Sequence, residues 1–192
     1  MNKKLFFIYI FLLAAGSIYA QKDPVAVFPK LPMDEKKEFV TYSKVINLGE
    51  TTADQLYHRG KKWFFSYFKN PTEKIRTDDS LKKEIEGFVR FKLMVPDKKG
   101  IESAVSTIQY SLFMNFKDGR YKYTINNINE LGVSNLGIEQ WLPESPAGKN
   151  ALPADAAKHA LWLTIIDKEI KTTIDALEKG MLDKGIKASE DW

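Results

Sequence analysis

The chain has 192 residues and no cysteine, with 29 basic and 25 acidic side chains. The lack of cysteine excludes a disulfide framework, and it excludes the thiol to which a bacterial lipid anchor is attached. The formal charge of +4 includes two lysines within the first 20 residues, and without them the balance is +2. A chain this close to neutral gives no indication of a nucleic-acid partner.

Residues 1–20 have the three parts of a secretory signal peptide. Lys3 and Lys4 form a basic start, an apolar run covers residues 5–15, and small residues lead to Ala20. We expect cleavage after Ala20 and export to the periplasm or the medium. An uncleaved anchor is the alternative, but the apolar run stops well short of the roughly 20 residues that a spanning helix needs. No later stretch is apolar for long enough to cross a membrane.

The remaining residues have the length of one domain. We predict an extended leader over residues 21–37, a single α+β domain over residues 38–180 and a polar tail over residues 181–192. Three prolines followed by four charged residues indicate the extended leader. Its apolar side chains either pack along an edge of the domain or belong to a loose tether, and both interpretations stay open.

The first strand and helix of the domain follow from local patterns. Alternating apolar residues predict a strand over residues 39–48. Thr52 and Gln55 have the spacing of a capping box, which predicts a helix from there to about residue 69. Gly60 lies within the apolar stripe of this helix, where alanine would favour the helical conformation more strongly.

The segment after this helix predicts two strands. Pro71 ends the helix, and we expect a short strand over residues 73–77, a polar turn over residues 78–82 and a longer strand over residues 85–95. The turn contains the best pair of adjacent carboxylates in the chain, Asp78 and Asp79. We expect both to be solvated.

A β-hairpin gives the clearest local signal. Residues 110–117 and 120–128 flank Asp118-Gly119, which predicts a two-residue type I′ turn with positive φ at both positions. This turn sets the register, in which the following residues face each other: Lys117 and Arg120, Phe116 and Tyr121, Met114 and Tyr123, Leu112 and Ile125. We expect the last three pairs on the buried face.

The other face of the hairpin predicts a candidate partner surface. Lys117, Arg120 and Lys122 surround Phe113 there, and cations around an aromatic side chain are typical of binding patches. A solvated sheet face is the alternative, because single exposed apolar residues are common.

Residues 129–152 predict a long loop before the final helix, and loops of this length are often functional. Trp141 within it is a candidate lid, partner contact or plug over the core. The final helix is predicted over residues 153–179, with its first half buried more deeply because Leu161 and Ile165 make it apolar on nearly all sides.

The order of elements is β-α-β4-α, which predicts an α+β fold with a curved antiparallel sheet and two helices packed on one face. Three motifs resemble a family of exported Bacteroidota proteins, the domain of unknown function family 4468 with a TBP-like (TATA-binding-protein-like) fold. They are Leu31-Pro32, Leu56-Tyr57 followed by Trp63, and Lys117-Asp118-Gly119-Arg120-Tyr121. The resemblance covers residues 31–128. It implies the fold and no chemistry.

No catalytic, metal-binding or cofactor-binding residue is assigned from the sequence. The only histidines are His58, on a predicted polar helix face, and His159, on an apolar one, so the usual zinc ligand sets cannot form. The chain also lacks a nucleophile elbow, a phosphate loop and a dinucleotide fingerprint.

The leading hypothesis is therefore a non-enzymatic envelope or secreted module that binds a protein or glycan, with no nucleic-acid partner. Its candidate surface consists of Phe113, Lys117, Arg120, Lys122 and Trp141. One alternative is a carrier of a small apolar ligand between the sheet and the final helix. Another is a hydrolase whose active-site residues are scattered along the chain.

Overall fold

The computed structural model describes residues 26–132, 136–145 and 155–183. The predicted signal peptide, the start of the leader, part of the 129–152 loop and the end of the tail lie outside these ranges. The elements in chain order are β1 (Tyr42–Asn47), α1 (Ala53–Tyr67), α2 (Pro71–Lys74), β2 (Ile75–Asp79), β3 (Glu84–Pro96), β4 (Glu102–Lys117), β5 (Arg120–Glu130), β6 (Leu136–Gly137), the 3₁₀ helix η1 (Ile138–Trp141) and α3 (Ala156–Leu182).

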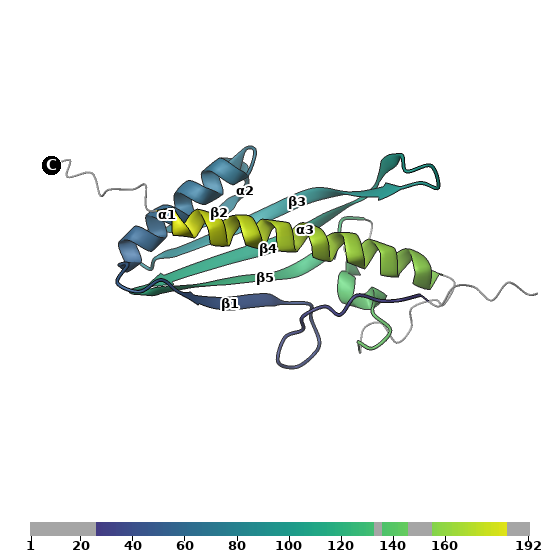
Figure 1. The fold of residues 1–192 in the computed structure, drawn as a ribbon, viewed down its shortest axis with the longest axis horizontal. Helices are drawn as coiled ribbons and strands as arrows, with labels where there is room; N and C mark the ends of the chain where they lie inside the picture. Colours follow the sequence, from purple (N-terminus) through teal and green to yellow (C-terminus); the bar gives the residue numbers. More distant parts are fainter. Residues whose placement is uncertain (1–25, 133–135, 146–154, 184–192) are drawn as a thin grey trace, which may run out of the picture.

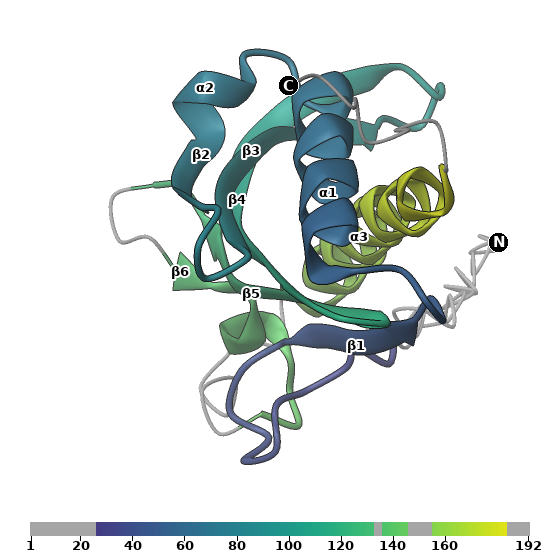
Figure 2. The same cartoon turned by 90° about the vertical axis from the view of Figure 1, so that its left-hand side faces the viewer.

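The strands form one antiparallel sheet in the order β1-β5-β4-β3-β2, with β6 paired to β5. α3 lies along the length of this sheet (Figure 1). The sheet curves around α1 and α3, so both of these helices occupy its concave side (Figure 2). The predicted α+β class and curved sheet are confirmed.

The two faces of the sheet follow the alternation of each strand. In β3, Ile85, Val89 and Leu93 are buried, while Arg90 and Lys92 on the other face are exposed. The helices cover the buried face with their own apolar stripes. The concave side is therefore the hydrophobic core, and the convex side meets the solvent.

The predicted register of the central hairpin is confirmed, because Lys117 pairs with Arg120 and Phe116 with Tyr121. The predicted type I′ turn is wrong, since Gly119 has a φ of 74° whereas Asp118 is not among the residues with positive φ. The Asp118 carboxylate instead accepts a 2.7 Å hydrogen bond from the amide of Ala53. The turn thus satisfies a free N–H at the start of α1.

The predicted capping box at the start of α1 is confirmed. The Thr52 hydroxyl accepts from the Gln55 amide, and the Gln55 side chain accepts from the Thr52 amide. α1 then ends at Tyr67, close to the predicted boundary.

Aromatic rings lie directly on glycine backbone at the helix contacts. A methyl group added at Gly60 of α1 would overlap the ring of Phe116 in β4. A methyl group at Gly87 of β3 would likewise overlap Phe64 of α1. The expectation that alanine suits position 60 better is therefore wrong, because the contact with the sheet outweighs helix propensity.

The predicted strand over residues 73–77 begins two residues later than expected. Pro71 opens the short helix α2, a position that suits its fixed φ, and β2 follows from Ile75. Asp78 consequently lies in β2 and not in a turn, although the residue is exposed, as expected. Its carboxylate accepts a hydrogen bond from the Tyr57 hydroxyl and pairs with Lys61 Nζ at 2.6 Å, which ties β2 to α1.

The first half of α3 is not the more deeply buried half. Leu161 is 43% exposed, whereas Ile170, Leu177 and Met181 are 0% exposed. The second half packs against both the sheet and α1, and the Arg59 guanidinium of α1 donates to the Met181 carbonyl. Met181 therefore belongs to the core and not to the predicted tail.

The described part of the leader packs against the domain, as one of the two interpretations expected. Leu31 is 8% exposed, and Phe28 and Met33 contact the same core. Met33 forms an isolated antiparallel bridge with Val40, and the Thr41 amide donates to the Pro32 carbonyl at 2.9 Å.

We predict that Gly60→Ala destabilises the protein. The overlap with Phe116 costs about 1–3 kcal/mol, which exceeds the helix-propensity gain of about 1 kcal/mol. Urea unfolding measures the change. In a Phe116→Leu background, where the ring is absent, the same substitution should be neutral or stabilising. A gain in the wild-type background would contradict the packing explanation.

We also predict that Asp78→Asn lowers the free energy of unfolding by about 1–3 kcal/mol near neutral pH, because the carboxylate accepts from two side chains. Burial opposes ionisation of Asp78, yet the hydrogen bonds from Lys61 and Tyr57 hold its pKa below the usual range. Its stabilisation is therefore present above the unfolded pKa of about 3.9 and is lost as the pH falls through the lower folded-state value.

Urea titrations at several pH values should show the difference between wild type and Asp78→Asn shrinking below about pH 4. Asp175→Asn on the exposed side of α3 is the control and should change stability by no more than about 0.5 kcal/mol. A constant difference down to about pH 2 would show that the charge of Asp78 contributes nothing.

Candidate functional site

The convex face brings four of the predicted site residues together. Phe113 and Lys117 of β4 lie on this face with Arg120 and Lys122 of β5, opposite the buried Phe116 and Tyr121. Phe113 is half-buried and faces Thr124 and Glu86 across the two neighbouring strands. The three cations are exposed. The arrangement predicted for the hairpin is thus present, although β3 also contributes to it.

A second aromatic group with cations lies on the same face and was missed by the sequence prediction. The guanidinium carbon of Arg76 is 4.0 Å from the centroid of the Phe88 ring, and that of Arg90 is 5.2 Å away. Contacts of this kind between a cation and an aromatic face are attractive. The alternation of the predicted 85–95 strand could have indicated this group. It places Phe88 and Arg90 on the face of the strand that points away from Ile85 and Val89.

Of the two glutamates of β3 on this face, Glu86 forms an ion pair and Glu84 accepts a hydrogen bond from a neutral amide, whereas most of the cations have no carboxylate partner. Glu84 accepts from Asn115 at 2.9 Å, and Glu86 pairs with Arg76 at 3.7 Å. Within the three described ranges, the remaining cations of the face make no ion pair: Arg90, Lys92, Lys117, Arg120 and Lys122. We call these five cations with Phe88 and Phe113 the convex-face cluster.

Trp141 does not belong to this cluster. It is 5% exposed and lies in η1, where its ring stacks on His159 with centroids 5.3 Å apart and an angle of 11°. Trp162 of α3 packs against the same indole edge-on. Of the three predicted roles, only a plug over the core agrees with this burial, so Trp141 is corrected from a surface residue to a core residue.

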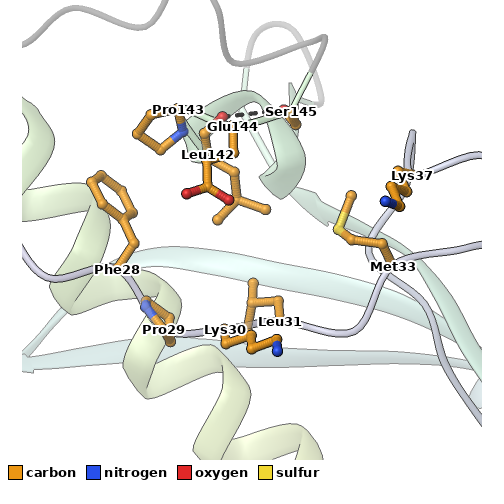
Figure 3. Close-up of a pocket in the computed structure, with 10 residues that line it drawn as sticks. All are labelled: Phe28, Pro29, Lys30, Leu31, Met33, Lys37, Leu142, Pro143, Glu144 and Ser145. Carbon is orange, nitrogen blue, oxygen red and sulfur yellow. Dashed lines mark hydrogen bonds between the residues drawn. The ribbon is translucent and has the colours of Figure 1, made fainter.

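The sequence prediction also missed a pocket between the leader and the segment after η1 (Figure 3). Its volume is about 450 Å³. Six apolar side chains line it, namely Phe28, Pro29, Leu31, Met33, Leu142 and Pro143, together with Lys30, Lys37, Glu144 and Ser145. We call it the leader pocket. No periodic pattern marks it, because its two walls are irregular segments far apart in the sequence.

Hydrogen bonds fix both walls of the leader pocket. On one wall, the Ser145 hydroxyl donates to the Glu139 carbonyl at 2.5 Å, and the Leu142 amide donates to the same carbonyl at 3.1 Å. On the other, the Asp34 carboxylate accepts from the amides of Glu38 and Phe39. These parts of the two walls are therefore held in place by the fold.

The predicted location of an apolar carrier site, between sheet and final helix, is filled by side chains. Leu163, Ile166 and Ile170 of α3 are 0% exposed, as are Leu112 and Ile125 of the sheet beneath the helices. A side chain with no solvent-accessible surface cannot line a cavity that is large enough to hold a water molecule. These residues leave no room for an enclosed ligand.

Neither a metal-binding cluster nor a membrane-spanning helix occurs in the described ranges. No group of three His, Asp or Glu side chains there has the geometry to hold a metal ion. None of the helices in the same ranges combines the length and hydropathy of a membrane-spanning segment.

The family model described as "Domain of unknown function (DUF4468) with TBP-like fold" matches residues 42–130. This stretch of the chain is a DUF4468 domain. It begins at the first residue of β1 and ends at the last residue of β5. The convex-face cluster therefore lies entirely within the DUF4468 domain, and the leader pocket lies entirely outside it.

Two solved structures share the fold. A TBP-like protein from Parabacteroides distasonis aligns with a TM-score of 0.55 and 15% identity, over 77% of this chain and 96% of that chain. A DUF4468 family protein from Bacteroides ovatus aligns with a TM-score of 0.55 and 16% identity, over 77% and 90% of the two chains. No curated protein matches the sequence. At these identities the likeness concerns the fold alone.

The burial of His159 against Trp141 leads to a testable prediction for the pKa of this histidine. Burial, followed by the charge of Lys158, lowers the pKa of His159. The neutral ring is favoured in the folded state, so its contribution to stability is present above the unfolded pKa of about 6.5 and is lost as the pH falls toward the folded-state value. We expect NMR titration to give a midpoint below about 6.5, with a His159→Gln spectrum for assignment. A midpoint above that value would contradict the burial.

Proposed function

We propose that this protein is a non-enzymatic binding module, acting in the envelope or outside the cell, whose convex sheet face binds an acidic protein or an acidic glycan. One observation carries the proposal: five exposed cations without carboxylate partners in the described ranges surround two half-buried phenylalanines on the sheet face opposite α1 and α3. A face of this charge attracts anions, and the two rings add contact area.

The distribution of the cluster favours an extended partner over a small molecule. Lys117, Arg120 and Lys122 lie near the β4–β5 turn, whereas Arg90 and Lys92 lie on β3. The carboxylates of Glu84 and Glu86, of which only Glu86 is ion-paired, separate the two groups. A partner with acidic groups at intervals can contact both groups of cations at once, and a convex surface offers no enclosure for a small ligand.

Charge reversal tests the proposal. We would measure binding of the purified protein to poly-glutamate and to alginate, with duplex DNA as a third probe, over a series of salt concentrations. Arg120→Glu combined with Lys122→Glu should weaken binding to at least one acidic polymer by about tenfold or more, because two attractive contacts become repulsive. Phe113→Ala should weaken the same interaction by a smaller factor.

The matched control reverses two lysines on the helical side of the molecule. Lys168→Glu combined with Lys179→Glu gives the same change in net charge on exposed residues of α3. It should leave the affinity within about twofold if contact with the convex face, and not net charge, determines binding. Equal losses in the two double variants, failure of both acidic polymers to bind, or tighter binding to DNA would overturn the proposal.

A further inference from the structure

We propose that the leader pocket is a binding site for a small amphiphile that has an apolar body and a carboxylate at one end. The site is separate from the convex-face cluster and independent of the function proposed for that face. It would bind a small molecule, whereas the convex face would bind a polymer.

The dimensions of the pocket suit a small molecule. Its volume of about 450 Å³ lies within the range of typical ligand pockets, about 300–1,000 Å³. Such pockets are lined mainly by apolar side chains with a few polar groups that orient the ligand. The leader pocket has this composition, with six apolar residues and four polar ones.

The apolar lining is continuous with the hydrophobic core. Leu31 and Leu142 are 8% and 9% exposed and belong to the core cluster, and Phe28 and Met33 pack against it. An apolar ligand in the pocket would therefore extend the core outward. Hydrogen bonds hold Leu142, Ser145 and the turn over residues 34–39, so these parts of the walls would need little ordering on binding.

Lys37 and Glu144 stand at different ends of the pocket, and the third charged lining residue, Lys30, lies between them beside Leu31. Figure 3 shows Lys37 beside Met33 at one end, and Glu144 beside Phe28 and Pro143 at the other. Within the described residues, neither Lys37 nor Glu144 takes part in an ion pair. An anionic group is attracted to the Lys37 end and repelled from the Glu144 end. This gives a carboxylate-bearing ligand one preferred orientation.

The probes for the experiment are three molecules with the same alkyl chain: decanoate, 1-decanol and decyltrimethylammonium. Each would be titrated into the full chain by calorimetry, below its micelle concentration. We expect decanoate to bind at least tenfold more tightly than decyltrimethylammonium, with 1-decanol between them. No binding of any of the three, or equal affinity of the three, would overturn the proposal.

Substitution of Lys37 tests the orientation. Lys37 has a φ of 58°, a left-handed conformation that asparagine tolerates well, so Lys37→Asn removes the charge with little backbone strain. It should weaken decanoate about tenfold and leave 1-decanol within about twofold. Lys36→Asn is the control, because Lys36 is exposed and does not line the pocket. A loss of the same size in both variants would overturn the role of Lys37.

A second variant tests the apolar wall. Met33→Asp places a charge in the pocket and should abolish binding of both decanoate and 1-decanol, while circular dichroism and the urea midpoint report whether the fold persists. Retained binding in a folded Met33→Asp protein would overturn the location. Sedimentation with and without decanoate identifies the remaining outcome: self-association that decanoate disrupts would mean that the occupant is a second copy of the chain, and it would overturn the proposal.

Discussion

The close contact between aromatic rings and glycine backbone sets the spacing of the layers in this protein. Phe116 lies on Gly60 of α1, Phe64 of α1 lies on Gly87 of β3, and Trp63 of α1 lies on Gly180 of α3. Each contact brings a ring to the distance of the backbone itself, which no residue with a Cβ permits. α1 is therefore held at fixed distances from the sheet and from α3. The sheet curves around both helices at these short separations (Figure 2).

Most of the fold could be predicted because its strongest signals are local. The capping box at Thr52 and the register around Asp118-Gly119 each depend on residues close together in the sequence. Two of the errors came from contacts over long sequence separations. Helix propensity disfavours Gly60, and only the position of Phe116 explains it. The φ of Asp118 likewise reflects the amide of Ala53, which lies 65 positions earlier.

The candidate sites could be predicted to different extents for the same reason. The alternation of β4 and β5 places Phe113, Arg120 and Lys122 on one face, and this needs only the hairpin register. Prediction of the group around Phe88 also requires the position of Arg76, which lies in a neighbouring strand with an irregular register. The leader pocket joins segments more than 100 residues apart, and neither has a periodic pattern. Burial of Trp141 depends on α3, which follows it in the chain.

The lengths of β2 and β3 give the cations of β3 a second physical role. β2 pairs with β3 only as far as Gly87, so β3 continues to Pro96 without a partner strand on that side in the described part of the chain. Unpaired edge strands invite pairing with strands of other molecules, which leads to aggregation. Arg90 and Lys92 place charge along this edge, Pro96 lacks an amide donor, and the register shift at Met94 bends the strand. The same positive charge that suits an acidic partner therefore also discourages edge-to-edge association.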